Sequence, residues 1–349
     1  MKSVFIEMEK MKNLNSGLGQ FCFHLGHALA SSFGNDIEPL FYMHSKLKGI
    51  FGPQYKYKEI AWWHKFVPVN SSKNQVWHCT HQQSNYLPSS SKTRLILTIH
   101  DLNFLEKNYS LSRKKMKLNA LQNKVDRADV ITVISEYSAQ VTRQYLNVKD
   151  KTIKVIYNGN SLKIFENSVR PAFVKSSDFI FTIGVIDQRK NFKTLLSLLS
   201  SKNDLHLIIA GNNADDYAKE MRAEAVRFGV SEKLMMPGLI NDSDKYWLYK
   251  NCTAFVFPSL AEGFGLPVVE AMSLGKPVFL SDATSLPEIG GKEAYYWNNF
   301  EPEYMLEVFQ NGMKEYVNDM DKPNRIKQWA AQFSWAKAAT DYINIYKDL

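Results

Sequence analysis

The sequence predicts an α/β protein made of two doubly wound, Rossmann-like domains that face a central cleft. Short apolar runs that fit buried strands alternate with segments of helical periodicity, which is the pattern of βαβ units and parallel sheets. This series runs twice, once before and once after the turn Asn158–Asn160. The chain has 349 residues and 45 % apolar side chains, a length and composition typical of two globular domains. Ligands of such folds bind outside the carboxyl ends of the strands, so the loops there are expected to carry the function.

The individual elements follow from the same periodicity. The expected strands are Ser3–Glu7, Leu95–Ile99, Val130–Val133, Lys154–Ile156, Phe179–Ile183, Leu205–Ala210, Ala254–Phe257 and Pro277–Leu280. The expected helices are Phe21–Ala30, Asn191–Leu199, Tyr217–Phe228, Pro267–Leu274 and a closing amphipathic helix over Trp329–Tyr346. The Asn-Gly-Asn turn and the weakly patterned residues Ser161–Ser177 form the expected linker. We therefore expect an N-terminal domain over residues 1–158, a C-terminal domain over 159–330 and a final segment over 331–349.

The cysteines and the apolar stretches indicate the compartment. Cys22, Cys79 and Cys252 are too few and too scattered for a disulfide framework or a zinc knuckle, so a reducing compartment fits. Residues Met1–Lys12 lack the layout of a signal peptide, and no stretch reaches the ~18 uninterrupted apolar residues of a membrane span. We expect a cytoplasmic protein rather than a secreted or an integral membrane protein.

Positive charge is concentrated in the first domain. Residues 1–158 hold 22 lysines and arginines against 11 acidic residues, a net charge of +11, whereas the remainder holds 21 against 24, a net charge of −3. Lys107–Lys117 has five basic residues and no acid, and Tyr42–Phe66 interleaves lysines with aromatic residues. Such segments suit an anionic membrane surface, where rings lie among the headgroups and ammonium groups stay in water. The alternatives are a solvated helix face with a partly buried loop, or a nucleic-acid surface, whose usual motifs this sequence lacks.

The segment Phe257–Pro277 carries the most specific chemistry. It predicts a strand that ends at Phe257, a loop rich in Pro, Ser and Gly, and a short helix with Pro267 at its start. Free amides at the start of this helix, together with the helix dipole, favour an anion such as a phosphate. Gly263 and Gly265 let the backbone approach such a ligand closely.

Two glutamates in this segment point to a sugar as well as a phosphate. Glu262 and Glu270 would repel a diphosphate, so they must face another part of the ligand. A carboxylate can accept two hydrogen bonds from a diol, so sugar hydroxyls are the natural partners. A nucleotide sugar, with a diphosphate between two sugars, satisfies the whole segment. The alternative for either glutamate alone is the acidic bias that is common at helix N-termini.

At this point the chain resembles a known family. The string E-G-F-G-L-P with its second glutamate resembles the E-x7-E motif of glycosyltransferase family 4, retaining enzymes with the GT-B fold. Five further segments resemble those of the family in the same order: Thr98–Asp101 (its histidine loop), Ser135–Ser138 (S-E-x-S), Val155–Gly159 (its hinge strand), Gly184–Asn191 (its phosphate loop) and Phe333–Trp335 (F-S-W). In this fold the first domain binds the acceptor, the second binds the nucleotide sugar, and the last helix crosses back to the first domain.

The resemblance implies which cations bind the diphosphate. Lys190 matches the family's diphosphate-binding lysine, where an ammonium would neutralise the departing phosphate. Many members carry an arginine directly after the glycine of this loop, where this chain has Val185. Arg189 would supply the second cation instead, because a guanidinium binds a diphosphate in a bidentate manner.

The resemblance also implies which residues bind the sugars. Glu270 would bind the ribose hydroxyls and Glu262 the transferred sugar, and His100 would hydrogen-bond the donor sugar near its reactive carbon. The catalytic set is thus His100, Glu262 and Lys190. The remaining residues expected to bind the donor are Gly184, Gly263, Phe264, Gly265, Leu266 and the backbone of a Gly17–Gly19 loop, which could also approach the acceptor.

The implied activity is that of a retaining hexosyltransferase. It would move a hexose, with mannose preferred, from a GDP- or UDP-linked sugar to a glycan or glycolipid in bacterial lipopolysaccharide, capsule or related polysaccharide synthesis. The family establishes no protein nucleophile, so a phosphate oxygen would act as the base, and neither a metal nor another cofactor is required. The strings Asp242–Asp244 and Asp319–Asp321 do not follow a buried strand, so they are predicted to be solvated surface. The alternative functions are a GT-B nucleotide-sugar epimerase and a non-catalytic nucleotide-sugar-binding subunit.

The basic first domain also suggests where the protein acts. It favours a peripheral position at the inner face of the cytoplasmic membrane.

Overall fold

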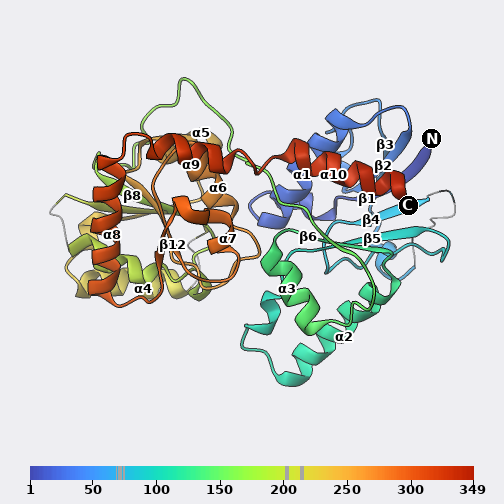
Figure 1. The fold of residues 1–349 in the computed structure, drawn as a ribbon, viewed down its shortest axis with the longest axis horizontal. Helices are drawn as coiled ribbons and strands as arrows, with labels where there is room; N and C mark the ends of the chain where they lie inside the picture. The colour runs from blue at the N-terminus through green and yellow to red at the C-terminus, as the bar shows by residue number, and fades with distance from the viewer. Residues whose placement is uncertain (68, 70–72, 74, 201–203, 213–215) are drawn as a thin grey trace. The chain divides into compact units, whose positions relative to one another are not determined.

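Each half of the chain is organised around its own parallel β-sheet in the computed structural model (Figure 1), which describes residues 1–67, 69, 73, 75–200, 204–212 and 216–349. Contacts divide the chain into a first unit, Met1–Gly159 with Phe333–Leu349, and a second unit, Asn160–Gln332. The sequence placed these divisions after residues 158 and 330. The two doubly wound α/β units of the predicted fold class are confirmed.

Within the described residues, the sheet of the first unit has seven strands in the order β3-β2-β1-β4-β5-β6-β7. The strands are β1 Lys2–Glu7, β2 Ile37–Met43, β3 Lys56–Glu59, β4 Val76–Cys79, β5 Arg94–Ile99, β6 Val130–Val133 and β7 Ile153–Val155. The helices are α1 Gly17–Ser32, α2 Leu111–Arg127, α3 Glu136–Tyr145 and α10 Trp335–Asp348. Apolar residues of the central strands are fully buried, which is typical of a parallel sheet covered by helices on both faces.

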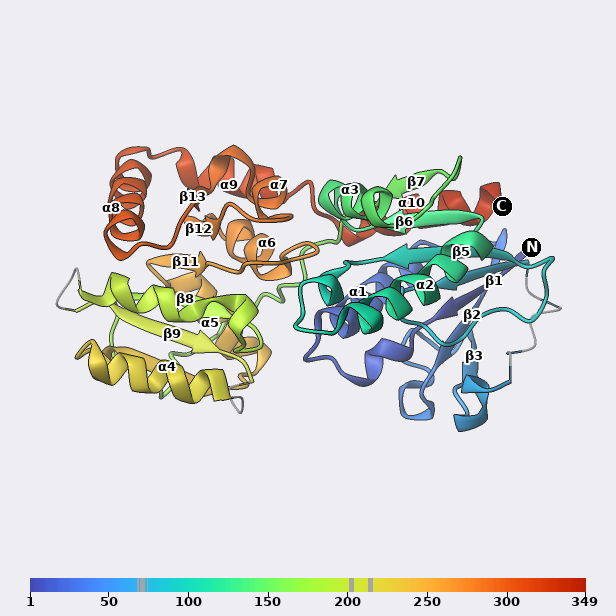
Figure 2. The same ribbon diagram turned by 90° about the horizontal axis from the view of Figure 1, so that it is seen from below.

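The described part of the second unit contains a six-stranded sheet in the order β10-β9-β8-β11-β12-β13. The strands are β8 Phe179–Ile183, β9 His206–Ala210, β10 Leu234–Gly238, β11 Ala254–Phe257, β12 Val278–Ser281 and β13 Tyr295–Trp297. The helices are α4 Asp216–Arg227, α5 Asp242–Asn251, α6 Leu266–Ser273, α7 Leu286–Gly290, α8 Pro302–Asn318 and α9 Lys322–Ala330. Figure 2 shows β9, β8, β11, β12 and β13 of the second unit stacked in this order.

Both sheets reverse their strand order at an equivalent place. In the first unit, β1 lies between β2 and β4, and in the second unit, β8 lies between β9 and β11. A crevice opens outside the carboxyl ends of the strands at such a switch point, and ligands bind there. The residues that follow β1 and β4, and those that follow β8 and β11, are therefore the candidates for function.

The final helix belongs to the first unit. Ser334 caps α10, and Trp335 packs so closely against Gly159 that a Cβ there would lie 2.1 Å from the Trp335 backbone nitrogen. The hydroxyl of Tyr346 lies 2.7 Å from Nδ1 of the buried His78 in β4. The F-S-W string thus marks the point where the chain returns to the first unit.

Three predicted elements are wrong in extent or type. The helix expected over Trp329–Tyr346 is two helices, because α9 ends at Ala330 and α10 begins only at Trp335 after its Ser334 cap. The segment expected as a helix over Asn191–Leu199 is 3-10 helix from Phe192 to Ser200, preceded by Asn191 in a left-handed conformation with φ of 54°. The helix expected over Phe21–Ala30 is longer, since α1 begins at Gly17.

Candidate functional site

The loop that follows β11 is held in one shape before α6 begins. Gly265 is the N-cap of α6 with φ of +111°, a conformation that favours glycine, and a Cβ there would lie 3.1 Å from Cδ2 of Leu286. The hydroxyl of Ser285 donates to the carbonyl oxygens of Glu262 and Phe264, each at 3.0 Å. The hydroxyl of Thr284 accepts from the Glu262 amide at 2.9 Å. Residues after β12 therefore fix the backbone that carries Glu262.

Glu262 lies in direct contact with both cations that the sequence singled out. Its Oε1 is 2.6 Å from Nζ of Lys190 and 3.1 Å from Nη1 of Arg189, and the Ser259 hydroxyl donates to the same oxygen. Burial raises the pKa of Glu262, but the charges of Lys190 and Arg189 outweigh it, so the pKa lies below its ordinary value. Glu262 is therefore ionised at neutral pH, with both cations on one oxygen.

Lys190 is buried in a pocket made by its own loop. Asp187 caps the short helix Gln188–Lys190 by accepting from the Lys190 amide at 3.1 Å, and the Lys190 ammonium lies 4.5 Å from the centre of the Phe257 ring. A Cβ on Gly184 would lie 3.2 Å from Cε of Lys190, so the glycine leaves room for this side chain. Burial lowers the pKa of Lys190, and the charge of Glu262 opposes that effect without cancelling it. The loops that follow β8 and β11 thus bring Lys190 and Glu262 into contact at the switch point.

Glu270 is the best-supported carboxylate of the segment, and two of its partners escaped the sequence analysis. The Lys245 ammonium donates to Oε1 at 3.0 Å, and the Tyr249 hydroxyl donates to Oε2 at 2.9 Å. Burial and the adjacent Glu270 raise the pKa of Tyr249 well above its ordinary value, so it remains a donor. Lys245 and Tyr249 lie four residues apart on α5, a spacing that puts them on one helix face. That spacing was the only available signal, and it is too common to indicate a site.

The other predicted donor-binding positions of the second unit differ in their exposure to solvent. Val185 is 45 % exposed and offers no charge. Nη1 of Arg189 donates to the Ala261 carbonyl at 2.6 Å as well as contacting Glu262, so Arg189 is tied to the β11 loop. Phe264 is buried, and Leu266 is the first residue of α6. Phe264 therefore offers a ligand its backbone rather than its ring.

His100 lies where β5 ends, and its ring is held in one tautomer. Nε2 donates to the Thr80 carbonyl at 2.8 Å. Burial lowers the pKa of His100 to about 4, so the ring is neutral at pH 7. With the proton on Nε2, Nδ1 carries a lone pair and can accept a hydrogen bond from a hydroxyl. His100 can therefore act as a neutral acceptor.

The backbone of His100 is clamped by side chains that the sequence analysis did not assign. The Gln82 side-chain oxygen accepts from the His100 amide at 3.1 Å, and the Gln82 amide group donates to the Asp101 carbonyl at 2.8 Å. The Ser138 hydroxyl donates to the His100 carbonyl at 2.8 Å. The second serine of the S-E-Y-S segment thus has a structural task, which is to fix the histidine loop.

The expectation that Gly17–Gly19 forms a loop before the helix is wrong. Ser16 caps α1, and both glycines lie in the first turn of that helix. A Cβ on Gly19 would lie 2.0 Å from the Asn13 carbonyl oxygen, whereas one on Gly17 would meet nothing within 4 Å. Gly19 is therefore required for close packing of α1 against the preceding chain.

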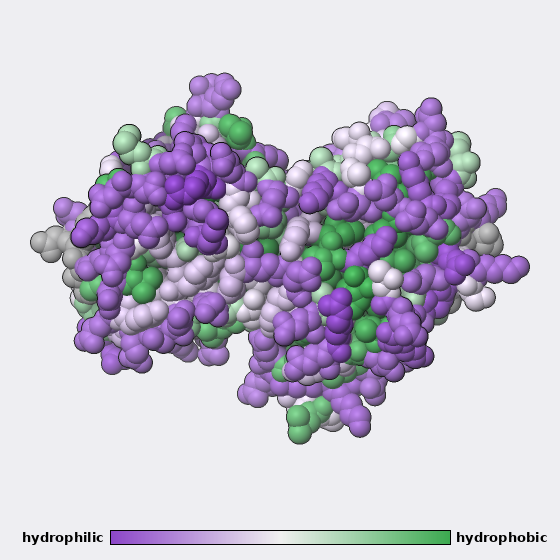
Figure 3. Space-filling model, viewed as in Figure 1, coloured by the Kyte–Doolittle hydropathy of each residue, from purple (hydrophilic) through white to green (hydrophobic). Residues whose placement is uncertain are grey.

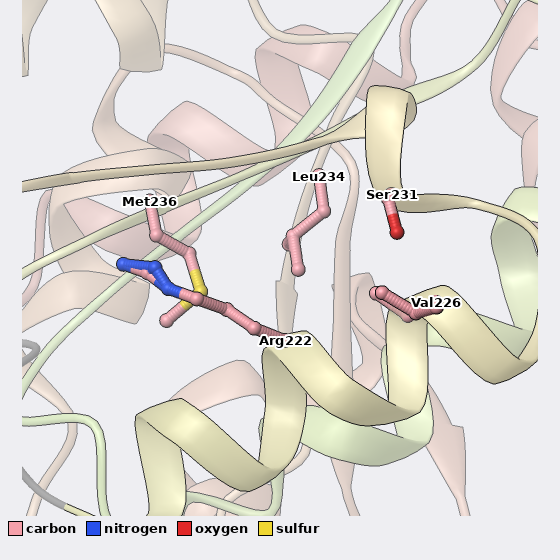
Figure 4. A pocket seen from close by; sticks show the side chains of 6 residues that line it. Arg222, Val226, Ser231, Leu234 and Met236 are labelled. Carbon is pink, nitrogen blue, oxygen red and sulfur yellow. The ribbon is translucent and has the colours of Figure 1, made fainter.

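The two pairs of aspartates from the sequence analysis lie at the starts of helices, and one cavity lies elsewhere in the second unit. Asp242 and Asp244 are in the first turn of α5, and Asp319 and Asp321 flank the start of α9, where both contact Arg325. A cavity of about 260 Å³ between α4 and the β10 edge (Figure 4) is lined by Arg222, Ala225, Val226, Ser231, Leu234 and Met236. None of these lining residues is among the residues that the sequence assigned to the donor.

Comparison with known proteins supports the fold and the family. Residues 164–333 match the family model described as glycosyl transferases group 1, and residues 38–163 match the model described as glycosyltransferase family 4. The structure of Anabaena HepE in complex with UDP-glucose has the same fold, with a TM-score of 0.75 and 15 % identity over all of both chains. Among the described residues, we find no helix with the length and apolar character of a membrane span.

Several related sequences bear the names of mannosyltransferases. The O-antigen chain mannosyltransferase B of Escherichia coli is 28 % identical over 284 residues, which are 76 % of this chain and 73 % of that protein. The serotype-specific mannosyltransferase WbdA of Escherichia coli is also 28 % identical, over 61 % of this chain. That match spans only 28 % of the length of WbdA. Together the two family models cover residues 38–333 of this protein, which belongs to glycosyltransferase family 4.

Proposed function

We propose that this protein is a retaining hexosyltransferase that moves mannose from a nucleoside-diphosphate sugar to a glycan or lipid-linked acceptor of a bacterial surface polysaccharide. The observation that carries the proposal is the buried contact between Lys190 and Glu262 at the switch point of the second sheet. Family membership supports the transfer reaction, and the names of the mannosyltransferase relatives support mannose and O-antigen synthesis.

The diphosphate is proposed to replace Glu262 as the ion-pair partner of Lys190. Both cations lie on one carboxylate oxygen of Glu262, and Lys190 is almost completely buried. A diphosphate carries more charge than a carboxylate, so it competes for the ammonium and leaves Glu262 able to accept hydrogen bonds from sugar hydroxyls. Lys190 then stabilises the charge that develops on the phosphate as the sugar leaves.

The remaining residues are proposed to orient the donor. Glu270, which Lys245 and Tyr249 hold in place, accepts hydrogen bonds from the ribose hydroxyls. His100 accepts a hydrogen bond from the transferred sugar through Nδ1. The acceptor attacks the face from which the diphosphate leaves, a phosphate oxygen takes its proton, and the protein contributes positioning and charge rather than a covalent nucleophile or a metal.

A panel of nucleotide sugars tests the proposal. We expect GDP-mannose or a related donor to raise the melting temperature, because a ligand at 100 times its dissociation constant adds about 2.7 kcal/mol of stability. The product formed with an acceptor should keep the anomeric configuration of the donor, as measured by NMR. Conversion of the donor to an epimer would instead indicate an epimerase, and donor binding without turnover would indicate a binding subunit. Inversion at the anomeric carbon would contradict the retaining mechanism.

The exposed apolar and basic side chains at the start of α2 lead us to propose a peripheral position on an anionic membrane, at its cytoplasmic face. Arg113 lies 4.2 Å over the Tyr109 ring, and Leu111 and Met116 are 86 % and 63 % exposed beside the basic residues of this segment. Figure 3 shows hydrophobic atoms among hydrophilic ones at the tip of the first unit around the start of α2. Exposed apolar side chains among cations suit a headgroup region.

Charge reversal tests the membrane surface separately from the reaction. Replacing Arg113, Lys114 and Lys115 with glutamate should weaken sedimentation with anionic liposomes, because each basic residue near such a surface contributes about 1 kcal/mol. A matched reversal of Lys193, Lys219 and Arg227 in the second unit is the control. Unchanged sedimentation of the first variant would remove the proposed surface, while transfer to a soluble acceptor should be unaffected in both.

A further inference from the structure

A buried cluster at the switch point of the first sheet is not used by the proposed reaction. Glu7 is the last residue of β1, Glu9 opens the short 3-10 helix that follows, and His81 comes two residues after β4. The strands β1 and β4 lie side by side (Figure 1). In this pair Ile6 lies opposite His78. One potential ligand atom from each of Glu7, Glu9 and His81 lies within 4.8 Å of the other two.

Glu7 and His81 lack the hydrogen bonds that buried polar groups normally have. Glu7 is 0 % exposed and His81 is 1 % exposed. Among the described residues, neither oxygen of Glu7 and neither ring nitrogen of His81 has a hydrogen-bond partner. A buried carboxylate without such partners costs several kcal/mol, so a group retained in this state indicates that something else binds it.

The spacing of the ligand atoms fits a tetrahedral metal ion. Nε2 of His81 lies 3.3 Å from Oε1 of Glu7 and 3.7 Å from Oε2 of Glu9. Zinc binds imidazole nitrogen and carboxylate oxygen at about 2.0–2.2 Å in a tetrahedron, which separates neighbouring ligand atoms by roughly 3.3–3.6 Å. A direct hydrogen bond would bring the atoms closer, to about 2.7–3.0 Å. The atoms are therefore spaced as ligands around one ion rather than as partners of each other.

A lysine ammonium already contacts one of the potential ligand atoms. The Lys10 ammonium lies 2.9 Å from Oε2 of Glu9, the oxygen that faces His81, and Lys12 lies 2.6 Å from Oε1. Burial raises the pKa of Glu9, but the hydrogen bonds from Lys12 and Lys10 outweigh it and lower the pKa to about 2. The side chain of Lys10 is 25 % exposed, so it can turn to solvent while Lys12 remains on the other oxygen.

We propose that Glu7, Glu9 and His81 bind a divalent transition-metal ion of the zinc class in the first unit, with a fourth position for water, and that Lys10 competes with this ion for Glu9. The site is independent of the donor chemistry proposed for the second unit. It would stabilise the carboxyl ends of β1 and β4.

Titration of the full chain, first stripped with EDTA and dialysed, with Zn²⁺ tests the site. We expect one equivalent to bind in calorimetry and to raise the melting temperature, and Co²⁺ to give the visible absorption of a tetrahedral complex. Glu7→Gln, which keeps the shape of the buried side chain, and His81→Gln, which keeps a polar side chain but removes the imidazole, should each weaken binding at least tenfold. Lys10→Met should strengthen it. His206→Ala, in the second unit, is the control for binding by an exposed histidine.

Several outcomes would overturn the site. These are the absence of a binding equivalent, equal Zn²⁺ affinity in Glu7→Gln and in the unaltered chain, and an octahedral Co²⁺ spectrum. If the glutamine variants lose secondary structure by circular dichroism, the Lys10→Met affinity decides, because Lys10 is partly exposed and its loss removes only a competitor. An unchanged or weaker affinity in Lys10→Met would contradict the proposal.

Discussion

The switch points of the two sheets hold the same kind of group in opposite surroundings. In the second unit, Glu262 contacts Lys190 and Arg189 at 2.6 and 3.1 Å and also accepts from Ser259. In the first unit, Glu7 has His81 at 3.3 Å and, within the described residues, no hydrogen-bond donor on either oxygen. Strand order fixes where a carboxylate can meet a ligand, whereas the neighbouring side chains decide which ligand it suits. The paired carboxylate suits exchange of its cation with a diphosphate, and the unpaired one suits a cation from solution.

The largest expected effect comes from removing the charges of the second unit. Lys190→Ala should lower kcat by 10²-fold or more, because one lost electrostatic contact to the leaving group is worth about 2.7–4 kcal/mol. Glu262→Ala should have an effect of similar size. Since the two side chains contact each other at 2.6 Å, the effects of removing them should not be additive, and the double variant should lose less than the product of the two single losses. Steady-state transfer rates measure all three.

A nearby lysine serves as the control for this prediction. Lys193 follows Lys190 by three residues but pairs with Glu220 at 2.9 Å and is partly exposed. Lys193→Ala should therefore leave kcat within about twofold, since surface ion pairs contribute about 0–1 kcal/mol. Near-unaltered rates in both Lys190→Ala and Glu262→Ala would show that these residues take no part in the reaction. The two switch points would then differ in structure but not in a shown catalytic role.

The sequence predicted the second switch point far better than the first. The glycines and Pro267 around Glu262 are strong local signals, and Lys190 follows a strand that was predicted with its correct bounds. In contrast, strands β2, β3 and β4 of the first unit were missed. KYKE in β3 is a charged edge strand, and VWHC in β4 is only four residues long. The missed strands of the second unit, β10 and β13, are the edges of its sheet and do not border the switch point. Without β4, nothing placed His81 beside Glu7. Partners brought together only by tertiary contacts leave no periodic pattern in one sequence.

The buried, neutral His100 of the first unit predicts a pH dependence of stability. The pKa of His100 is about 4 in the folded state against an ordinary value of 6.5, so the unfolded chain binds more protons between these values. Stability is therefore present above pH 6.5 and is lost as the pH falls towards 4, by about 3 kcal/mol for this group. Urea unfolding at pH 7 and pH 4.5 measures the loss, which should be smaller in His100→Gln. The same slope in both proteins would contradict the assignment of His100 as a buried neutral group.

A smaller effect is expected at Glu270, which the sequence analysis identified without its partners Lys245 and Tyr249. Tyr249→Phe removes one hydrogen bond to Glu270, worth about 1–2 kcal/mol, so the KM for the donor should rise about tenfold with little change in kcat. Tyr246→Phe on the same helix, whose ring packs against Phe165, is the matched control. A fall in kcat with unaltered KM would place Glu270 near the reacting atoms rather than at the ribose.

The smallest expected effect is that of EDTA, which should change the two switch points differently. EDTA should leave the transfer rate unchanged, because Lys190 and Arg189 already supply the positive charge that a metal would bring to the diphosphate. If the first unit binds zinc, the same treatment should lower the melting temperature of the unaltered chain, because a ligand that binds only the folded state stabilises it. That fall should be absent in His81→Gln, where the ion has lost its nitrogen ligand. A loss of transfer in EDTA that His81→Gln also shows would assign a metal to the donor site, because in that variant the first-unit ion no longer contributes.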